Sequence, residues 1–463
     1  MSAENISAQS PALERRLGLG NAISLNMMNM IGVGPFITLP LVVAAMGGSQ
    51  AILGWVLGAI IAFCDGLVWA ELGAAMPEAG GSYTFLREIY GREGAGRWLS
   101  FLYIWQLGFS APLSIASGCI GLAQYAAYLW PSLRVSIWHV PLVSLVAAAT
   151  CVFAVALLYR NMTAIARLAW IMTAGVLVTI FAVILAGATH FHPAMLAPAH
   201  GAFSLHAGFF EGLGAATLLA TYDYWGYYNV AFLGAEVRNP GRVIPRAVLW
   251  SIAIVAALYL AMQISVLGVI PVQEMTHAGA AKLAIVAVLM QQTFGPTAAR
   301  ILALLVMWTA FASVFSLLLG YSRVPYAAAL DGNYFRIFAR VHPRHKFPNI
   351  SLLALGAVAV IFCFFDLAVV IAALVAIRIL LQYILQQVGV IVLRIKRPQM
   401  PRPFRIWLYP LPPLLALAGF IFIVFSRKQA SRELLDAVFV AVSGSLIYFA
   451  RAYARHEWPF RTR

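Results

Sequence analysis

The chain has 463 residues, of which 62% are apolar and only 10% charged, and its mean hydropathy is +0.86. Soluble globular proteins carry about 25% charged residues, so this composition excludes a water-soluble fold and predicts an all-α protein that crosses the membrane many times. The net charge of +15 does not require a nucleic-acid partner, because most basic residues fall in loops on one predicted side of the membrane.

Twelve predicted spans account for most of the chain, and no connection between them is long or polar enough to form a separate soluble domain. The segment 271–296 is predicted to form an external loop with one short amphipathic helix. Residues 1–18 and 453–463 are predicted tails, and the first span is too long for a signal peptide. The approximate bounds of the spans are 19–46, 50–76, 98–128, 138–159, 165–189, 208–236, 245–270, 299–328, 349–365, 367–393, 404–426 and 434–452.

The distribution of Lys and Arg predicts the orientation of the chain. Of 31 such residues, six lie in loops on one side and Arg378 lies within a span. The other 24 lie in the N-terminal tail, in the segments 77–97, 160–167, 238–246, 323–346 and 394–405, and at the C-terminus from Arg451 onward. We therefore expect both termini to face the cytoplasm, together with the loops 77–97, 237–244, 329–348 and 394–403.

The cysteines and histidines predict no disulfide, metal or cofactor site. The nine histidines lie in loops or at span ends without metal-ligand spacing, and the spans contain no nucleophile–base set, so an enzyme is not expected. Four cysteines fall in separate apolar spans, at Cys64, Cys119, Cys151 and Cys363.

Two predicted spans contain residues that interrupt a helix. The first reads MIGVGPFITLP at 30–40, where Gly32, Gly34 and Pro35 disfavour a continuous helix. The sixth reads TYDYWGYYN at 221–229, where glycine, polar and aromatic residues interrupt an apolar run. The alternative explanation is that these glycines only allow close packing between helices.

The two interruptions occupy matching positions in two halves of the chain. Gly34 and Gly226 lie 192 residues apart, and each interrupted span opens a set of five, at 19–189 and 208–393, with 404–452 appended. This arrangement predicts a transporter built from inverted repeats, whose free backbone groups bind the ligand near the membrane midplane. The candidate substrate-binding residues are Ile31, Gly32, Val33, Gly34, Phe36, Tyr222, Asp223, Tyr224, Trp225, Gly226 and Tyr227.

Five motifs, in the same order along the chain, resemble those of the amino acid–polyamine–organocation (APC) superfamily. The resemblance covers nearly the whole chain and implies a leucine-transporter-type fold with alternating access around a midplane site. It also implies that a substrate carboxylate meets backbone amides of the first break and that the amino group meets carbonyls of both breaks. The motifs are IGVGPF (31–36), AELGAAMPEAGGSY (70–83), GAEVRNPGRVIPRA (234–247), YSRVPYAAALDGNYF (321–335) and VLRIKRPQMPRPFRIWLYP (392–410).

Finer features resemble two branches of this superfamily. The segment GPF (34–36) and Asp65 resemble the plant-type polyamine-uptake branch, whereas the sixth break resembles the large-neutral-amino-acid branch. In the latter comparison Tyr222 takes the place of a gating aromatic residue and Asp223 replaces a small residue. Proton-coupled and exchanger relatives often carry a lysine on the fifth helix, where this chain has Val176, so the coupling ion, H⁺ or Na⁺, stays open.

Charged residues inside spans are costly and usually functional. Asp223 would pair with a substrate ammonium or carry a coupled proton, or else cap the broken helix. Asp65 would act in a proton relay or in a structural hydrogen bond. Arg378 is expected to pair with a buried acid such as Asp65 or Glu211, or with backbone carbonyls, and gating is the alternative role.

For three further residues the sequence leaves two roles or two interaction partners open. Ser313 and Ser316 on the eighth span would help to coordinate sodium, or would bond their own backbone. Glu236, at the cytoplasmic end of the sixth span, is expected to pair with Arg246 or another loop cation. The aromatic residues of the sixth break lie near mid-span, so we expect them to stack on a substrate rather than to form an interfacial belt.

The sequence therefore predicts a secondary active permease for amino acids in a plasma or bacterial inner membrane, coupled to protons or working by exchange. A polyamine or organic-amine transporter of the same fold is the alternative. A channel is less expected, because it would need pore-lining rings. The short connection at 237–244 also disfavours a carrier of the major facilitator type, which usually has a long central loop.

Overall fold

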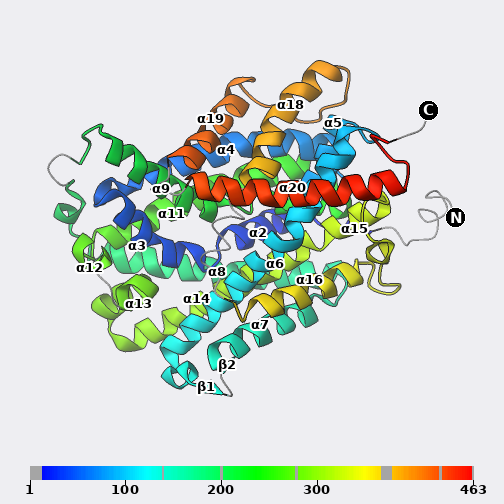
Figure 1. The fold of residues 1–463 in the computed structure, drawn as a ribbon. Coiled ribbons are helices and arrows are strands. Elements are labelled where there is room, and N and C mark those ends of the chain that lie inside the picture. The colour runs from blue at the N-terminus through cyan, green and yellow to red at the C-terminus, as the bar shows by residue number, and fades with distance from the viewer. Residues whose placement is uncertain are drawn as a thin grey trace.

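The computed structural model describes residues 13–137, 140–198, 202–276, 280–365, 378–426 and 430–460. Helices form nearly all of the regular structure in these ranges (Figure 1). One short hairpin, β1 (Ser136–Ile137) and β2 (Val140–Pro141), pairs in antiparallel fashion. Helices are the expected outcome, because a helix satisfies its own backbone hydrogen bonds where lipid offers none.

Six described helices are long and apolar enough to cross a membrane, or seven when one bent pair counts as a single span. The bent pair is α2 (Leu19–Met30) and α3 (Gly34–Met46), which meet at 49°. The protein is therefore a multi-pass membrane protein. The six are α4 (Ile52–Ala75), α6 (Ala95–Leu129), α8 (Met162–Thr189), α11 (Pro240–Leu267), α14 (Pro296–Tyr321) with α15 (Arg323–Leu330), and α20 (Ala430–Ala454).

Shorter elements complete the described chain. Four of them are apolar helices of 10–17 residues, namely α7 (Leu142–Leu158), α13 (Ala280–Phe294), α16 (Asn349–Phe362) and α19 (Leu411–Phe425). The others are η1 (Ser49–Ala51), α5 (Ser82–Tyr90), η2 (Pro131–Arg134), η3 (Pro193–Leu196), α9 (Ala207–Tyr224), α10 (Asn229–Phe232), η4 (Gly234–Glu236), α12 (Val272–Thr276), η5 (Arg336–Ala339), η6 (Ile379–Ile384) and α18 (Leu385–Lys396).

Most helix ends fall within a few residues of the predicted spans, and the differences have local causes. The predicted span 404–426 is α19, which begins only at Leu411, because the prolines that follow suit the first turn of a helix but not its interior. The segment 271–296 contains two helices, α12 and α13, instead of one amphipathic helix, and α13 buries Ile285 and Leu289. Residues 366–377 of the predicted tenth span lie outside the described residues.

The broken helices lie inside the bundle. Helix α2 packs against α8, α11 and α14, and α3 packs against α9 and α13. Helix α4 runs alongside α9 and α11. Figure 1 shows α2 near the centre of the helices, while α20 crosses the outside of the bundle over α6. Residues of the two breaks are therefore surrounded by protein, as a backbone with unpaired groups requires in a membrane.

A polar network closes the end of the bundle where α10 finishes and α11 begins. Glu236 and Arg323 are each 1% exposed and form a bidentate ion pair, with nitrogen–oxygen distances of 3.1 and 2.9 Å. The backbone N–H of Leu17 donates to the carbonyl of Glu236 at 2.9 Å. Glu236 forms an ion pair as predicted, but its partner is Arg323 at the start of α15 and not Arg246 or another loop cation.

Candidate functional site

The first break separates α2 from α3 at residues 31–33. Gly32 donates its N–H to the Met30 carbonyl at 3.1 Å, only two residues back, so α-helical bonding has ended there. Helix α3 starts at Gly34, whose N–H has no carbonyl of its own helix to bind. Pro35 follows in the first turn, where its missing N–H costs the helix nothing. The predicted break in the first span is confirmed.

Asp223, in the last turn of α9, places its carboxylate at the start of α3. Its Oδ2 accepts a hydrogen bond from the Thr38 hydroxyl of α3. A Cβ atom added at Gly34 would collide with the Oδ1 atom, so a glycine is needed to leave room for this carboxylate. Among the described residues Oδ1 has no hydrogen-bond partner, and Asp223 is only 3% exposed. The first break thus faces a buried carboxylate with one free oxygen.

The sixth span breaks after Tyr224, as the sequence predicts. Trp225 leaves the helix with an extended backbone, at φ −61° and ψ 138°. Gly226 follows with a φ of +131°, which residues with a side chain rarely adopt. A Cβ atom at Gly226 would also lie 2.7 Å from the backbone nitrogen of Met30. The two breaks are therefore in direct contact, and Gly226 permits that contact.

Two polar side chains join the breaks. The Tyr259 hydroxyl of α11 donates to the Met30 carbonyl at 2.8 Å and also lies 3.3 Å from the Asp223 carbonyl. The Asn26 Oδ1 atom of α2 accepts a hydrogen bond from the Val230 N–H of α10 at 2.9 Å. These bonds satisfy backbone groups that the breaks leave without partners in their own helices.

The aromatic residues of the sixth break do not all face the same way. Tyr224 packs on rings of α4 and α11, and Tyr228 stacks on Trp69 with ring centres 4.7 Å apart. Tyr222 and Trp225 lie together on another side, with ring centres 5.7 Å apart. Trp225 lies beside Arg378, which is described next, and Tyr222 packs on Trp225.

Arg378 lies against the Trp225 side of the sixth break. Its Nη2 atom donates to the Ser114 hydroxyl of α6 at 3.2 Å. Its guanidinium carbon lies 5.9 Å from the ring centres of both Trp225 and Tyr321. The side chain is only 5% exposed, yet among the described residues no carboxylate forms an ion pair with it. Within the part of the chain that the structure describes, Arg378 is therefore a buried cation without an anionic partner.

Asp65 is buried in α4 and is not the partner of Arg378. Its two carboxylate oxygens accept hydrogen bonds from the Tyr227 hydroxyl and from the Gln387 amide of α18. The predicted pairing of Arg378 with Asp65 is therefore wrong, because the described contacts of Arg378 are a hydroxyl and two aromatic faces. Its pairing with Glu211 or with backbone carbonyls stays a prediction. Asp65 links three elements, namely α4, the sixth break and α18.

The two serines of α14 lie against the first span. Ser316 donates to the Leu25 carbonyl at 2.7 Å and accepts a hydrogen bond from the Asn229 amide at 2.8 Å. The Ser313 hydroxyl would lie 2.9 Å from a Cβ atom at Gly32. Across the described ranges, no group of three His, Cys, Asp or Glu side chains is placed to hold a metal ion.

Several residues of this region were not anticipated from the sequence. Thr38, Tyr259 and Ser114 contact Asp223, the first break or Arg378, but each is an ordinary polar residue within an apolar run. Their scarcity in such runs is the only signal that the sequence offers. Their partners lie 36–264 positions away, so no local pattern identifies them.

Comparison with known proteins gives consistent findings. The model of the amino acid permease family matches residues 17–443. An uncharacterised transporter of Mycobacterium tuberculosis is 33% identical over 350 residues, which cover 75% of this chain and 73% of that protein. The serine/threonine exchanger SteT of Bacillus subtilis is 26% identical over 442 residues, with 94% and 97% covered. The branched-chain amino acid permease BcaP of Lactococcus lactis is 24% identical over 451 residues, with 95% and 93% covered.

Proposed function

The chain belongs to the amino acid permease family, and from this premise we propose that it is a secondary active permease that moves amino acids by alternating access. Relatives named as an amino acid exchanger and an amino acid permease support the substrate class. One observation carries the proposal: the two broken helices are in contact with each other. The buried carboxylate of Asp223 and the buried guanidinium of Arg378 both lie beside this contact.

The proposed architecture has twelve spans in a leucine-transporter-type arrangement of two inverted five-span repeats. The repeats are residues 19–189 and 208–393, with two further spans in 404–452. The breaks at the first span of each repeat support this division, because matching broken helices mark the binding site of such transporters. Asn26, Tyr259 and Asp223 join the two repeats at the level of the breaks.

Asp223 is proposed to bind the substrate ammonium. One of its oxygens accepts a hydrogen bond from the Thr38 hydroxyl. The other has no partner among the described residues, so it is available as an acceptor. A charged hydrogen bond to an ammonium in this buried place would be worth about 1.5–3 kcal/mol. Tyr222 precedes Asp223 in the chain and packs on Trp225, whose ring centre lies 5.9 Å from the guanidinium carbon of Arg378, so we place the substrate beside Tyr222.

Arg378 is proposed to bind the substrate carboxylate. The carboxylate of Asp223 already lies at the start of α3, and a second negative group there would be repelled. Arg378 offers the opposite charge and has no carboxylate partner among the described residues, and a buried cation without a partner is costly. A zwitterion would supply both missing partners at once. A guanidinium also suits a carboxylate geometrically, because it donates two parallel hydrogen bonds.

A polyamine transporter is the second candidate, and the position of Asp223 is the observation that favours it. A carboxylate at the start of α3 attracts cations in the place where a helix N-terminus would otherwise favour an anion. Arg378 argues against this candidate, because a substrate with several positive charges would approach a buried guanidinium. Removal of the Arg378 charge therefore separates the two functions.

The test is Arg378→Gln, with Arg300→Gln as its control, since Arg300 is an exposed arginine of α14 without a described ion pair. Binding is measured as the thermal shift of the purified protein on a panel of amino acids and polyamines. If an amino acid is the substrate, Arg378→Gln weakens its binding about tenfold or more and Arg300→Gln does not. Polyamine binding that is unchanged or stronger in Arg378→Gln, with no amino acid bound by wild type, would establish the second candidate instead.

The proposed location is the plasma or bacterial inner membrane, with both termini in the cytoplasm. The bias of 24 to six basic residues supports this orientation. Single cysteines placed at Arg340 and Arg397 in a cysteine-free background test it. In intact cells both should be protected from an impermeant thiol reagent and should react after permeabilisation. Labelling of either position in intact cells would reverse the orientation.

The proposed coupling ion is a proton. Ser316, one of the two candidate sodium ligands, donates its hydroxyl to Leu25 and accepts a hydrogen bond from Asn229, so only one lone pair of its oxygen is left for an ion. Asp65 offers a buried carboxylate that accepts hydrogen bonds from the sixth break and from α18. Protonation of this carboxylate would change both bonds and so the contact between these two elements. Asp65 is therefore proposed to carry the coupled proton, while Asp223 binds the substrate.

A further inference from the structure

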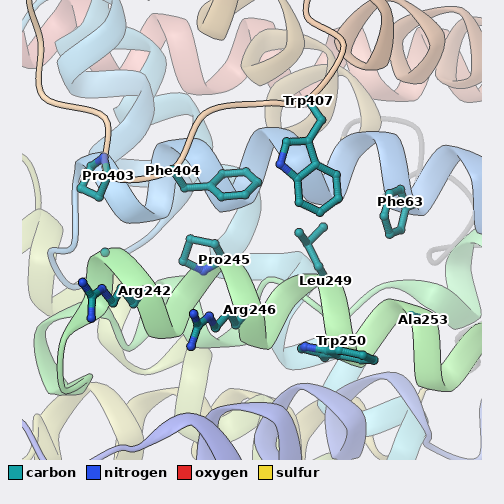
Figure 2. A pocket seen from close by; sticks show the side chains of 11 residues that line it. Phe63, Arg242, Pro245, Arg246, Leu249, Trp250, Ala253, Pro403, Phe404 and Trp407 are labelled. Atoms are coloured by element: carbon teal, nitrogen blue, oxygen red, sulfur yellow. The ribbon is translucent and has the colours of Figure 1, made fainter.

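A groove of about 460 Å³ lies between α11 and the segment that precedes α19, and none of the residues that line it belongs to either break (Figure 2). Two rows of residues at four-residue spacing on α11 form its floor, and the segment 403–407 with Phe63 of α4 forms the opposite wall. The first row is Arg242, Arg246 and Trp250, and the second is Gly241, Pro245, Leu249 and Ala253.

The two ends of the groove differ in chemistry. Arg242 and Arg246 lie at the end where α11 begins, one helical turn apart, and both are exposed. Neither forms an ion pair with any described residue. Glu236, the nearest acid in the sequence, is paired with Arg323. Figure 2 shows the two arginines on α11 with Phe404 on the facing segment. This end therefore presents two neighbouring positive charges that are accessible to an anion.

The other end of the groove is apolar. Leu249, Ala253 and Phe63 line it, and from Gly241 to Ala253 the groove follows α11 for about 18 Å, at 1.5 Å per residue. Trp250 is 58% exposed and Trp407 is 56% exposed, so both rings face the surroundings of the bundle. Tryptophan is enriched where a membrane protein passes from the headgroup region into hydrocarbon. This arrangement is the one expected of a groove that begins at a headgroup region and continues into hydrocarbon.

We propose that this groove binds one anionic phospholipid from the leaflet at this end of the bundle, which the basic residues of the chain assign to the cytoplasm. Arg242 and Arg246 bind the phosphate and headgroup. The upper part of one acyl chain lies along Leu249 and Ala253, beneath Trp407. The combination of two unpaired cations and an apolar channel fits an amphiphilic anion, whereas a free phosphate would use only the arginine end. This site is separate from the substrate site and does not depend on the identity of the substrate.

Native mass spectrometry of the purified full-length protein, with phosphatidylglycerol or phosphatidylcholine added, tests the proposal. The variant Arg242→Gln/Arg246→Gln removes both charges. Arg160→Gln/Arg167→Gln is the control, because it removes two exposed arginines that also lie on the predicted cytoplasmic side and have no described ion pair. A third variant, Leu249→Trp, fills the apolar end and keeps both arginines. Inorganic phosphate and glycerol 3-phosphate serve as soluble competitors.

Wild type is expected to retain one phosphatidylglycerol in preference to phosphatidylcholine, and soluble phosphates should not displace it. Arg242→Gln/Arg246→Gln should retain about tenfold less, since each basic residue contributes to the attraction of an anionic headgroup, while the control should match wild type. Leu249→Trp should also lose the lipid. Equal retention by both double variants, equal retention of the two lipids, or unimpaired binding in Leu249→Trp would overturn the proposal. Displacement by inorganic phosphate would overturn it in favour of a free-phosphate site. Should the arginine variant not fold, Leu249→Trp and the lipid preference of wild type still decide the outcome.

Discussion

The Asp223 carboxylate lies against the α-carbon of Gly34, so that the end of α9 and the start of α3 meet without space for a methyl group between them. The two residues are 189 positions apart and belong to different broken spans. Asp223 is held there by the Thr38 hydroxyl, three residues beyond Pro35 in the same helix. The place where a ligand would meet the first break is therefore defined by residues of both breaks.

Gly34→Ala is predicted to abolish substrate binding, because the added methyl group would displace the Asp223 carboxylate. Gly108→Ala, in α6, is the matched control, since nothing lies within 4 Å of the position that its Cβ would take. Thermal shift with the substrate measures binding, and size-exclusion chromatography checks that both variants fold. Full affinity in Gly34→Ala would mean that the substrate does not use this junction.

Asp223→Asn should weaken substrate binding about tenfold or more, because the loss of a buried charged partner costs about 1.5–3 kcal/mol. The amide still accepts the hydrogen bond from Thr38, so the helix junction should survive. Asp436→Asn changes an exposed aspartate of α20 and should leave the affinity unchanged. Equal affinity of Asp223→Asn and wild type for every amino acid and amine tested would remove Asp223 from the site.

The pair of Glu236 and Arg323 should show strong coupling in a double-mutant cycle. Both side chains are 1% exposed, so Glu236→Gln leaves a guanidinium buried without its counter-ion and should destabilise the protein by about 3–5 kcal/mol. Glu236→Gln/Arg323→Met removes both charges and should unfold at a higher temperature than either single variant. Additive effects of the two changes would contradict a direct interaction.

The start of α6 and the end of α20, which Glu457 joins, should separate more easily at low pH. Partial burial alone would raise the pKa of Glu457, but hydrogen bonds from Arg451 and Arg97 outweigh it and lower the pKa below its ordinary value of 4.5. A carboxylate with a lowered pKa stabilises the folded state above its unfolded pKa, and this contribution is lost as the pH falls through the folded value.

Glu457→Gln should therefore lower the unfolding temperature at pH 7, by an amount that corresponds to about 1 kcal/mol at most for ion pairs at this level of exposure. The difference from wild type should shrink once the pH falls below 4.5. Differential scanning fluorimetry between pH 7 and pH 3.5 measures it. A difference that stays constant over this range would rule out titration of Glu457 as the cause.

The breaks were predictable from sequence because glycine and proline act on their own segment of backbone. Gly32, Gly34 and Pro35 disfavour a helix wherever the rest of the chain lies, so the interruption of the first span could be located to a few residues. The start of α19 was predicted seven residues too early. A span is located from its apolar residues, and apolar residues such as Trp407 and Leu408 here precede the helix.

The partners of the buried charges were not predictable in the same way. Arg378 was expected to pair with a buried carboxylate or with backbone carbonyls, since a buried charge needs partners. Its actual neighbours, Ser114, Trp225 and Tyr321, come from three elements, and their packing decides which groups are near enough. Pairing across helices depends on the rotation of each helix within the bundle, and sequence patterns leave that rotation open.

Asp65→Asn is predicted to uncouple transport from the proton gradient. The amide cannot release a proton, but it still occupies the place between Tyr227 and Gln387, so the helices should remain joined. In proteoliposomes the variant should lose accumulation driven by a pH gradient and keep counterflow exchange of substrate, which needs no coupled ion. Tyr227→Phe removes one hydrogen bond and leaves the titratable carboxylate, so it should retain gradient-driven accumulation. Accumulation by wild type that follows a sodium gradient and survives collapse of the pH gradient would assign the coupling to sodium and remove this role from Asp65.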